Sequence, residues 1–319
     1  MHADKILLWE IYRVKYFLYF NLYLMKIIFI GAGEIGMAIN EIINKKDFEI
    51  MMWDKDISKV PNQLSIEETV KGADVIFLCV PSKFVREAIR SFLNFLEKTT
   101  IVVSISKGLE IDSGKTIDLV LEQELPEKHA HALLSGPMLG EELYDGLMGA
   151  AVIASEDKNV LDILSNVFKG THLKTETSVD MYSTALTGVL KNIYAIAFGA
   201  FDALHYGANS KGWLFSESLK EMRGMMEILK ADPNRALSFS GIGDLVATGS
   251  SPYSCNFTLG YELACGNNPG FSCEGKISLP SVIAMLGDDF YTFPIAEAVM
   301  KIVIDGENAK DVFDQLIYG

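Results

Sequence analysis

The sequence predicts an α/β fold in which a doubly wound, mostly parallel sheet is followed by an all-helical C-terminal domain. Short apolar runs rich in β-branched residues alternate with helical patterns up to about residue 179, as expected of parallel strands covered by helices. From Asp180 to Gly319 helical patterns continue without a convincing strand. We therefore divide the chain into an N-terminal extension (1–24), an α/β domain (25–179) and a helical domain (180–319).

The first unit of the α/β domain carries a glycine fingerprint. Residues 26–30 predict a strand, Gly-Ala-Gly-Glu-Ile-Gly follows, residues 37–44 predict a helix, and residues 48–53 predict a second strand. Such glycines permit a tight turn, a close approach to a pyrophosphate and close helix–strand packing, and the helix N-terminus attracts phosphate. This pattern predicts a Rossmann-type dinucleotide site; the alternative is a purely structural turn. The predicted cofactor contacts are Gly31, Gly33, Glu34, Ile35, Gly36 and Asp54.

The remaining elements follow from periodicity. Further strands are expected at residues 73–80, 100–106, 130–134, 150–154 and 172–175. Helices are expected at residues 66–72, 85–96, 117–125 and 160–168, and then at 181–205, 209–229, 256–265, 279–285 and 293–304. On the helix at 209–229 we expect Glu217, Glu221 and Arg223 on the solvent side.

Composition excludes several classes of partner. The chain has 49% apolar residues, 22% charged residues and a net charge of −14, so neither nucleic acid nor an anionic membrane is expected as the main partner. Its four cysteines lack metal-ligand spacing, which indicates no metal and a reducing, cytoplasmic location. The apolar run at 16–24 is too short to span a bilayer. We expect Met25 to be the natural start; the alternative is a membrane-surface or interface helix. The apolar helical domain could also offer a homodimer face.

Four charged residues are candidates for chemistry. Lys107 closes a predicted strand, so it should lie at the same sheet edge as the fingerprint. Lys191 lies inside an apolar helix, where burial would lower its pKa and suit it to proton transfer, or where its side chain could snorkel to the surface. Lys211 opens a helix, where a solvated lysine is the ordinary interpretation. Asp244 lies between glycines, either as a helix N-cap or as a catalytic group.

With these residues assembled, the chain resembles the NAD(P)-dependent glycerol-3-phosphate dehydrogenases from about Met25 to Gly319. The resemblance rests on a series of short motifs in order. These are GAGEIG at 31–36, VPS at 80–82, SKGLE at 106–110, LSGP at 134–137, GVLKN at 188–192, GAN at 207–209, GDL at 243–245 with Thr248, EG at 274–275 and PIAEA at 294–298.

The resemblance implies reversible hydride transfer between NAD(P)H and dihydroxyacetone phosphate, giving sn-glycerol 3-phosphate for glycerophospholipid synthesis. It implies that Lys191 is the general acid/base, that Lys107 binds or polarises this small phosphorylated substrate, and that Asp244 sets the protonation and orientation of Lys191. The other implied substrate contacts are Asn192, Thr248 and Asn256. Pro81, Asn256 and Glu274 are implied at the cofactor.

One position departs from the family pattern. An arginine that grips the substrate phosphate is expected before Asn256, and Cys255 stands there. A thiol cannot supply the bidentate contact of a guanidinium. Either Lys107, Lys211 or another cation substitutes, or the substrate is a different 2-oxo compound; a catalytically silent nucleotide-binding protein is the third interpretation. Asp54 favours NAD because an acid there repels a 2′-phosphate, whereas Lys55 favours NADP.

Overall fold

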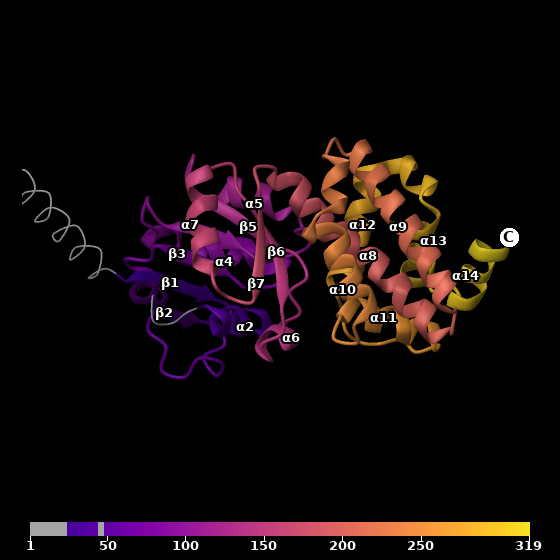
Figure 1. The fold of residues 1–319 in the computed structure, drawn as a ribbon, viewed down its shortest axis with the longest axis horizontal. Helices are drawn as coiled ribbons and strands as arrows, with labels where there is room; N and C mark the ends of the chain where they lie inside the picture. Colours follow the sequence, from indigo (N-terminus) through magenta and orange to yellow (C-terminus); the bar gives the residue numbers. More distant parts are fainter. Residues whose placement is uncertain (1–23, 44–47) are drawn as a thin grey trace, which may run out of the picture.

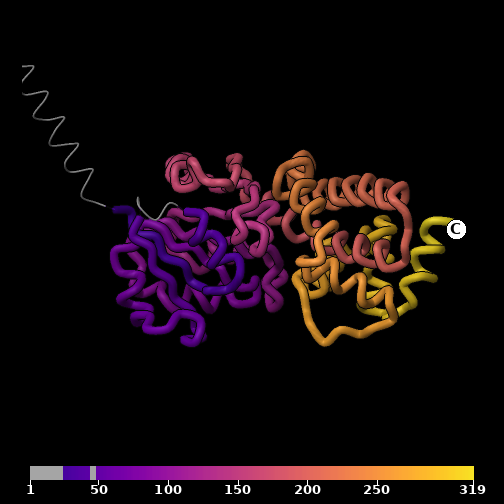
Figure 2. The backbone as a smooth tube through the Cα atoms, turned by 60° about the horizontal axis from the view of Figure 1, so that its bottom comes forward, coloured from indigo at the N-terminus to yellow at the C-terminus, as the bar shows by residue number. Residues whose placement is uncertain are grey.

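The computed structural model describes residues 24–43 and 48–319. Apart from Leu24, the predicted N-terminal extension lies outside these residues. Two lobes lie side by side, a sheet with helices on both faces and an assembly of helices, and the C-terminus lies at the far end of the helical lobe (Figures 1 and 2).

A seven-stranded sheet forms the first lobe, in the order β2-β1-β3-β4-β5-β6-β7. The pairs are parallel except β5 with β6, which are antiparallel. The strands are β1 (Met25–Ile30), β2 (Phe48–Trp53), β3 (Val75–Leu78), β4 (Ile101–Ser104), β5 (His131–Ser135), β6 (Gly149–Ala154) and β7 (Leu173–Ser178). Because β1 lies between β2 and β3, the strand order changes direction at its carboxyl end, where ligands bind in such sheets.

Helices bury both faces of this sheet. On one face, α2 (Glu34–Ile42) and α7 (Lys158–Phe168) share a core with Ile27 and Phe29 of β1. On the other, α3 (Ile66–Val70), α4 (Val85–Phe92) and α5 (Ile117–Glu124) pack on Ile28 and Ile30. Alternate residues of one strand thus enter opposite cores, which explains the nearly continuous apolar runs of these strands. A short helix absent from the predictions, α6 (Gly140–Tyr144), packs against α2.

The second lobe is built around α8 (Met181–Ala203), whose residues from Leu186 to Phe201 are buried. Helix α8 is long and apolar enough to cross a membrane, but 94% of its most apolar window is buried inside the protein, as in the central helix of a folded domain. Around it lie α9 (Ala208–Ile228), α10 (Asp244–Ser250), α11 (Cys255–Ala264), α12 (Glu274–Leu286), α13 (Pro294–Met300) and α14 (Ala309–Tyr318). A π-helical turn, η4 (Phe239–Gly243), precedes α10.

The structure corrects one expectation in this lobe. Glu221 does not face solvent but is 7% exposed. Its carboxylate accepts hydrogen bonds from the backbone N–H groups of Ile295 and Ala296, at 2.8 and 3.1 Å, and from the Tyr194 hydroxyl at 3.2 Å. The N-terminus of α13 covers this side of α9, a packing that the periodicity of α9 alone cannot indicate.

Candidate active site

The glycine fingerprint forms a tight turn between β1 and α2. Gly31 has φ of +103°, and a Cβ there would lie 2.6 Å from the Cys79 carbonyl oxygen. A Cβ at Gly36 would lie 2.3 Å from the Gly31 carbonyl oxygen, whereas one at Gly33 would meet nothing within 4 Å. Gly31 and Gly36 are therefore needed by the fold itself, while Gly33 leaves open space at the start of α2. No side chain caps this helix, so its first N–H groups suit a pyrophosphate.

A cavity of about 570 Å³ adjoins the turn. Its lining includes Gly31, Gly33, Asp54, Lys55 and Pro81. The buried Asp54 carboxylate accepts hydrogen bonds from the backbone N–H groups of Ala32 at 2.7 Å and Asp56 at 2.8 Å. Glu34 lines a second cavity, beside α6, and Ile35 is half-buried. The residues present thus fit a dinucleotide, with space at Gly33 and an acid at the end of β2.

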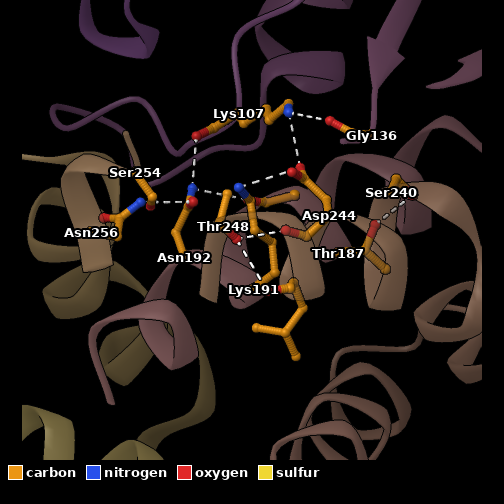
Figure 3. Close-up of polar contacts among 12 residues, drawn as sticks. Lys107, Gly136, Thr187, Lys191, Asn192, Ser240, Asp244, Thr248, Ser254 and Asn256 are labelled. Atoms are coloured by element: carbon orange, nitrogen blue, oxygen red, sulfur yellow. Dashed lines mark hydrogen bonds and ion pairs between the residues drawn. The ribbon is translucent and has the colours of Figure 1, made fainter. Parts of the chain in front are cut away.

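Two lysines meet one carboxylate where the lobes face each other. The Lys107 ammonium, which follows β4, lies 2.9 Å from Asp244 Oδ2 and donates to the Gly136 carbonyl at 2.5 Å. Lys191 Nζ, from α8, lies 3.3 Å from the same oxygen. Figure 3 shows Lys107 and Gly136 reaching in from the sheet lobe toward Lys191 and Asp244 on the helices. The predicted catalytic residues therefore converge, and Asp244 is not the N-cap of α10, because Gly243 occupies that position.

The surroundings of Lys191 favour proton transfer. Lys191 is 3% exposed and Asp244 is 1% exposed, which excludes the snorkelling alternative. Burial lowers the pKa of Lys191 to about 8; Asp244 opposes this effect and the Lys107 charge adds to it. A lysine with this pKa changes protonation state close to neutrality, which suits a general acid/base.

Two asparagines continue the hydrogen bonding beside this cluster, and one of them, Asn192, joins the two lobes. Asn192 Nδ2 donates to the carbonyls of Lys107 at 3.2 Å and Gly188 at 3.0 Å. Asn192 Oδ1 accepts from Asn256 Nδ2 at 2.9 Å, and Asn256 Oδ1 accepts from the Gly275 N–H at 2.9 Å. The chain of hydrogen bonds therefore runs from the loop after β4 through α8 and α11 to α12. Figure 3 shows its first part, from Lys107 through Asn192 to Asn256.

Thr248 lies in the same region of α10 but turns inward. Its hydroxyl donates to the Asp244 carbonyl at 2.6 Å, and the side chain is 6% exposed. This hydrogen bond lies within α10, the helix that carries Asp244, and joins Thr248 to the backbone of that residue.

Glu274 joins the lobes at a second point. Its carboxylate accepts from the Ser82 backbone N–H at 3.1 Å and the Ser82 hydroxyl at 2.7 Å, and burial raises its pKa while the Ser82 contacts oppose that. A Cβ on Gly108 would lie 2.2 Å from this carboxylate. Ser82, Gly108 and Gly136 are not among the predicted site residues. The signal that points to them in the sequence is their place in the VPS, SKG and SGP motifs.

The cations proposed to replace the arginine are placed differently. Lys107 lies in the cluster, but Lys211 pairs with Asp202 and lines a separate cavity with Phe198 and Phe257. Cys255 is exposed at the start of α11, next to Asn256. Lys211 is therefore committed elsewhere in this structure.

Two family models match this chain. A family model described as NAD-dependent glycerol-3-phosphate dehydrogenase N-terminus matches residues 58–161, and the model of the C-terminus of the same family matches residues 180–314. The chain belongs to the NAD-dependent glycerol-3-phosphate dehydrogenase family.

Relatives match this family member over nearly their whole length. A glycerol-3-phosphate dehydrogenase [NAD(P)+] of Fusobacterium nucleatum is 29% identical, with 92% of this chain and 97% of the relative covered. One from Bacillus velezensis is also 29% identical, with 92% and 94% covered. The crystal structure of glycerol-3-phosphate dehydrogenase from Coxiella burnetii superposes with a TM-score of 0.82 at 23% identity, covering 92% of this chain and 99% of that one. The structural likeness confirms the predicted fold, and the family is the one expected from the motifs.

Proposed function

We propose that this chain is a glycerol-3-phosphate dehydrogenase that transfers hydride reversibly between NAD(P)H and dihydroxyacetone phosphate, giving sn-glycerol 3-phosphate for glycerophospholipid synthesis. The observation that carries the proposal is the buried Lys191, 3.3 Å from Asp244 and poised with a pKa of about 8. A structural protein would gain nothing from burying a lysine and an acid beside a second, partly buried lysine, since such burial is costly.

The proposed mechanism turns on one proton. NAD(P)H, when bound, supplies the hydride to the substrate carbonyl carbon. Lys191, as the ammonium, donates a proton to the carbonyl oxygen as negative charge develops there, and in the reverse direction the neutral amine removes the proton from the hydroxyl. Lys107 holds and polarises the substrate, and Asp244 keeps both lysines oriented. We assign Asn192, Thr248 and Asn256 to the wall of the substrate site.

The glycine turn and the cavity beside it support the cofactor site. Gly33 leaves room for the pyrophosphate, and Gly31, Gly36 and the start of α2 shape its cradle. We place Glu34, Ile35, Pro81 and Glu274 around the cofactor, and infer that residues 25–179 bind it while residues 180–319 bind substrate.

We infer that NAD is preferred because Asp54 closes β2 and lines the cavity. Asp54→Asn, which keeps an acceptor for the Ala32 N–H, should raise the NADPH/NADH ratio of kcat/KM by about tenfold, the value of one charge contact. An unchanged ratio would remove Asp54 from cofactor selection.

Cys255 favours a second candidate function, in which a related dehydrogenase reduces a different 2-oxo compound. The deciding assay follows NADH oxidation with dihydroxyacetone phosphate and with a panel of non-phosphorylated ketones. Turnover of the phosphate ester supports the main proposal, and turnover confined to the panel supports the second. Cofactor binding without turnover of either would leave only a silent nucleotide-binding protein.

Two further properties belong to the proposal. We place the enzyme in the cytoplasm, because its four cysteines show no spacing typical of a disulfide framework, as expected in a reducing compartment. Exposed apolar side chains on the helical lobe, among them Trp213, Ile304 and Tyr318, are compatible with a homodimer. Light scattering of the purified chain would measure its mass directly.

A further inference from the structure

Two cysteines meet at the starts of neighbouring helices beside the proposed active site. Cys255 is the first residue of α11, and Cys273 is the N-cap of α12. Cys255 Sγ lies 3.8 Å from the carbonyl oxygen of Ser272, the residue directly before Cys273, so the two thiols are close neighbours. The Asn256–Gly275 hydrogen bond, 2.9 Å long, holds the two helix starts together.

The two thiols differ in a way that suits sequential reaction. Cys255 is exposed, whereas Cys273 is 5% exposed. The contact with Cys273 lowers the pKa of Cys255, although burial opposes this, and the same contact raises the pKa of Cys273. Cys255 also lies in the first turn of α11, at the positive end of the helix, which favours its thiolate form. An accessible thiol of lowered pKa backed by a buried thiol is the arrangement of an attacking and a resolving cysteine.

We propose that Cys255 and Cys273 form a reversible disulfide by exchange with a small-molecule disulfide, and that this bond controls the adjacent active site. The Cys255 thiolate attacks one sulfur of the small disulfide, giving a mixed disulfide and releasing one thiolate, which takes up a proton. Cys273 then loses its proton and attacks the Cys255 sulfur, and the second small thiol leaves. The protein loses two hydrogens, and the small disulfide gains them as two thiols.

The consequence for the active site follows from what Asn256 holds. A disulfide brings two sulfurs to about 2.05 Å, closer than any non-bonded thiol contact. The two side chains must therefore turn toward each other, and we expect the starts of α11 and α12 to be drawn together with them. Asn256 follows Cys255 directly and donates to Asn192, the neighbour of Lys191. Because a displacement of about 1 Å can cost a hundredfold in rate, we expect oxidation to lower kcat/KM tenfold or more. This regulatory effect rests on the proposed function, whereas formation of the bond does not.

The bond can be tested on the full chain with oxidised glutathione, followed by thiol blocking and mass spectrometry. No lysine or arginine lies between the two cysteines, but Glu262 does, so a glutamate-specific protease separates them. Cys265, which is exposed and lies between them in sequence, provides the control. We expect a cross-linked peptide pair in the wild type and in Cys265→Ser, and none in Cys255→Ser or Cys273→Ala. A missing cross-link in the wild type, or one that survives Cys255→Ser, overturns the proposal.

Activity before and after oxidation tests the regulatory part. Each protein is compared with its own reduced form, and dithiothreitol should restore the wild type and Cys265→Ser. The kcat/KM of Cys255→Ser should not change on oxidation. Because this substitution lies at an exposed position, the test can still be made if Cys273→Ala does not fold. A cross-linked enzyme with unchanged kcat/KM would refute the control of the site. If the reduced enzyme turns over no substrate, the proposed function fails, while the mass measurement still decides whether the disulfide forms.

Discussion

Helix α8 contributes to two polar clusters, through Lys191 and, three residues later, Tyr194. Each cluster keeps a charged side chain out of water, but the charge is compensated differently in the two. In the first, Lys191 and Lys107 share the Asp244 carboxylate. In the second, the Tyr194 hydroxyl and two N–H groups at the start of α13 surround Glu221. Burial moves the pKa of Lys191 down to about 8 and that of Glu221 up to about 7.

The difference lies in what compensates each charge. Glu221 is satisfied by neutral donors within one lobe, at a helix N-terminus that favours an anion, and such an arrangement holds a helix in place. Lys191 depends on one carboxylate that it shares with a second lysine from the opposite lobe. That cluster is costly to keep and able to exchange a proton, so we assign chemistry to the first cluster and architecture to the second.

The largest effect should come from Lys191→Met, which removes the proton donor but keeps an apolar side chain of similar length. We expect kcat to fall by about 10²- to 10⁴-fold, the usual contribution of a general acid, with NADH affinity nearly unchanged. Glu221→Gln is the matched control and should change kcat less than twofold. Steady-state kinetics and fluorescence titration with NADH measure both quantities. Comparable losses of kcat in the two variants would abolish the distinction between the clusters.

The pH profile separates the clusters next. Ketone reduction needs the Lys191 ammonium, so its kcat/KM should fall roughly tenfold per pH unit above pH 8. The oxidation of glycerol 3-phosphate needs the neutral amine, so its kcat/KM should fall instead as the pH drops below 8. Asp244 raises the pKa of Lys191, so Asp244→Asn should move these limbs of the pH profiles to lower pH as well as slow the enzyme. Glu221→Gln should leave the limbs in place. A profile that is unaltered in Asp244→Asn would contradict the role given to this acid.

The sequence indicated the first cluster better than the second. The strand–glycine–helix unit is local, so its turn could be predicted residue by residue, and Lys107 follows β4 at the expected edge. Lys191 stayed ambiguous because an apolar helix does not reveal which partners its charge will meet. Glu221 was assigned to solvent because the α9 pattern contains no information about α13. The antiparallel pairing of β6 and the short helices α6 and α10 also depend on distant contacts.

Stability should depend on pH with opposite signs in the two clusters. The folded pKa of Lys191 lies below its ordinary 10.5, so the unfolded chain holds the extra proton between pH 8 and 10.5 and stability rises with pH there. The folded pKa of Glu221 lies above its ordinary 4.5, so stability falls as pH rises from 4.5 to about 7. Across each of these pH ranges the free energy of unfolding should change by at most about 3 kcal/mol. Urea unfolding at a series of pH values measures both effects. Lys191→Met should flatten the rise in stability above pH 8, and Glu221→Gln should flatten the fall between pH 4.5 and 7. If either variant keeps the pH dependence of the wild type, the residue replaced in it is not its source.

The smallest effect should come from Tyr194→Phe, three residues from Lys191 on the same helix. The variant loses one hydrogen bond to Glu221, so the free energy of unfolding should fall by about 1 kcal/mol while kcat stays constant. The Tyr194 contact lowers the pKa of Glu221, so the midpoint of its pH-dependent slope should also move upward. A kcat that falls in parallel with stability would mean that the two clusters are not independent.

The shared carboxylate has a consequence for the catalytic cycle. Lys107 comes from the sheet lobe, whereas Lys191 and Asp244 belong to the helical lobe. Any separation of the lobes would withdraw the like charge of Lys107 and admit water, and both changes raise the pKa of Lys191. An open enzyme would therefore take up a proton from solvent, and closure would weaken the hold on that proton just before it is needed. Opening and closing of the lobes would then load Lys191 with a proton and prepare it to release that proton to the substrate.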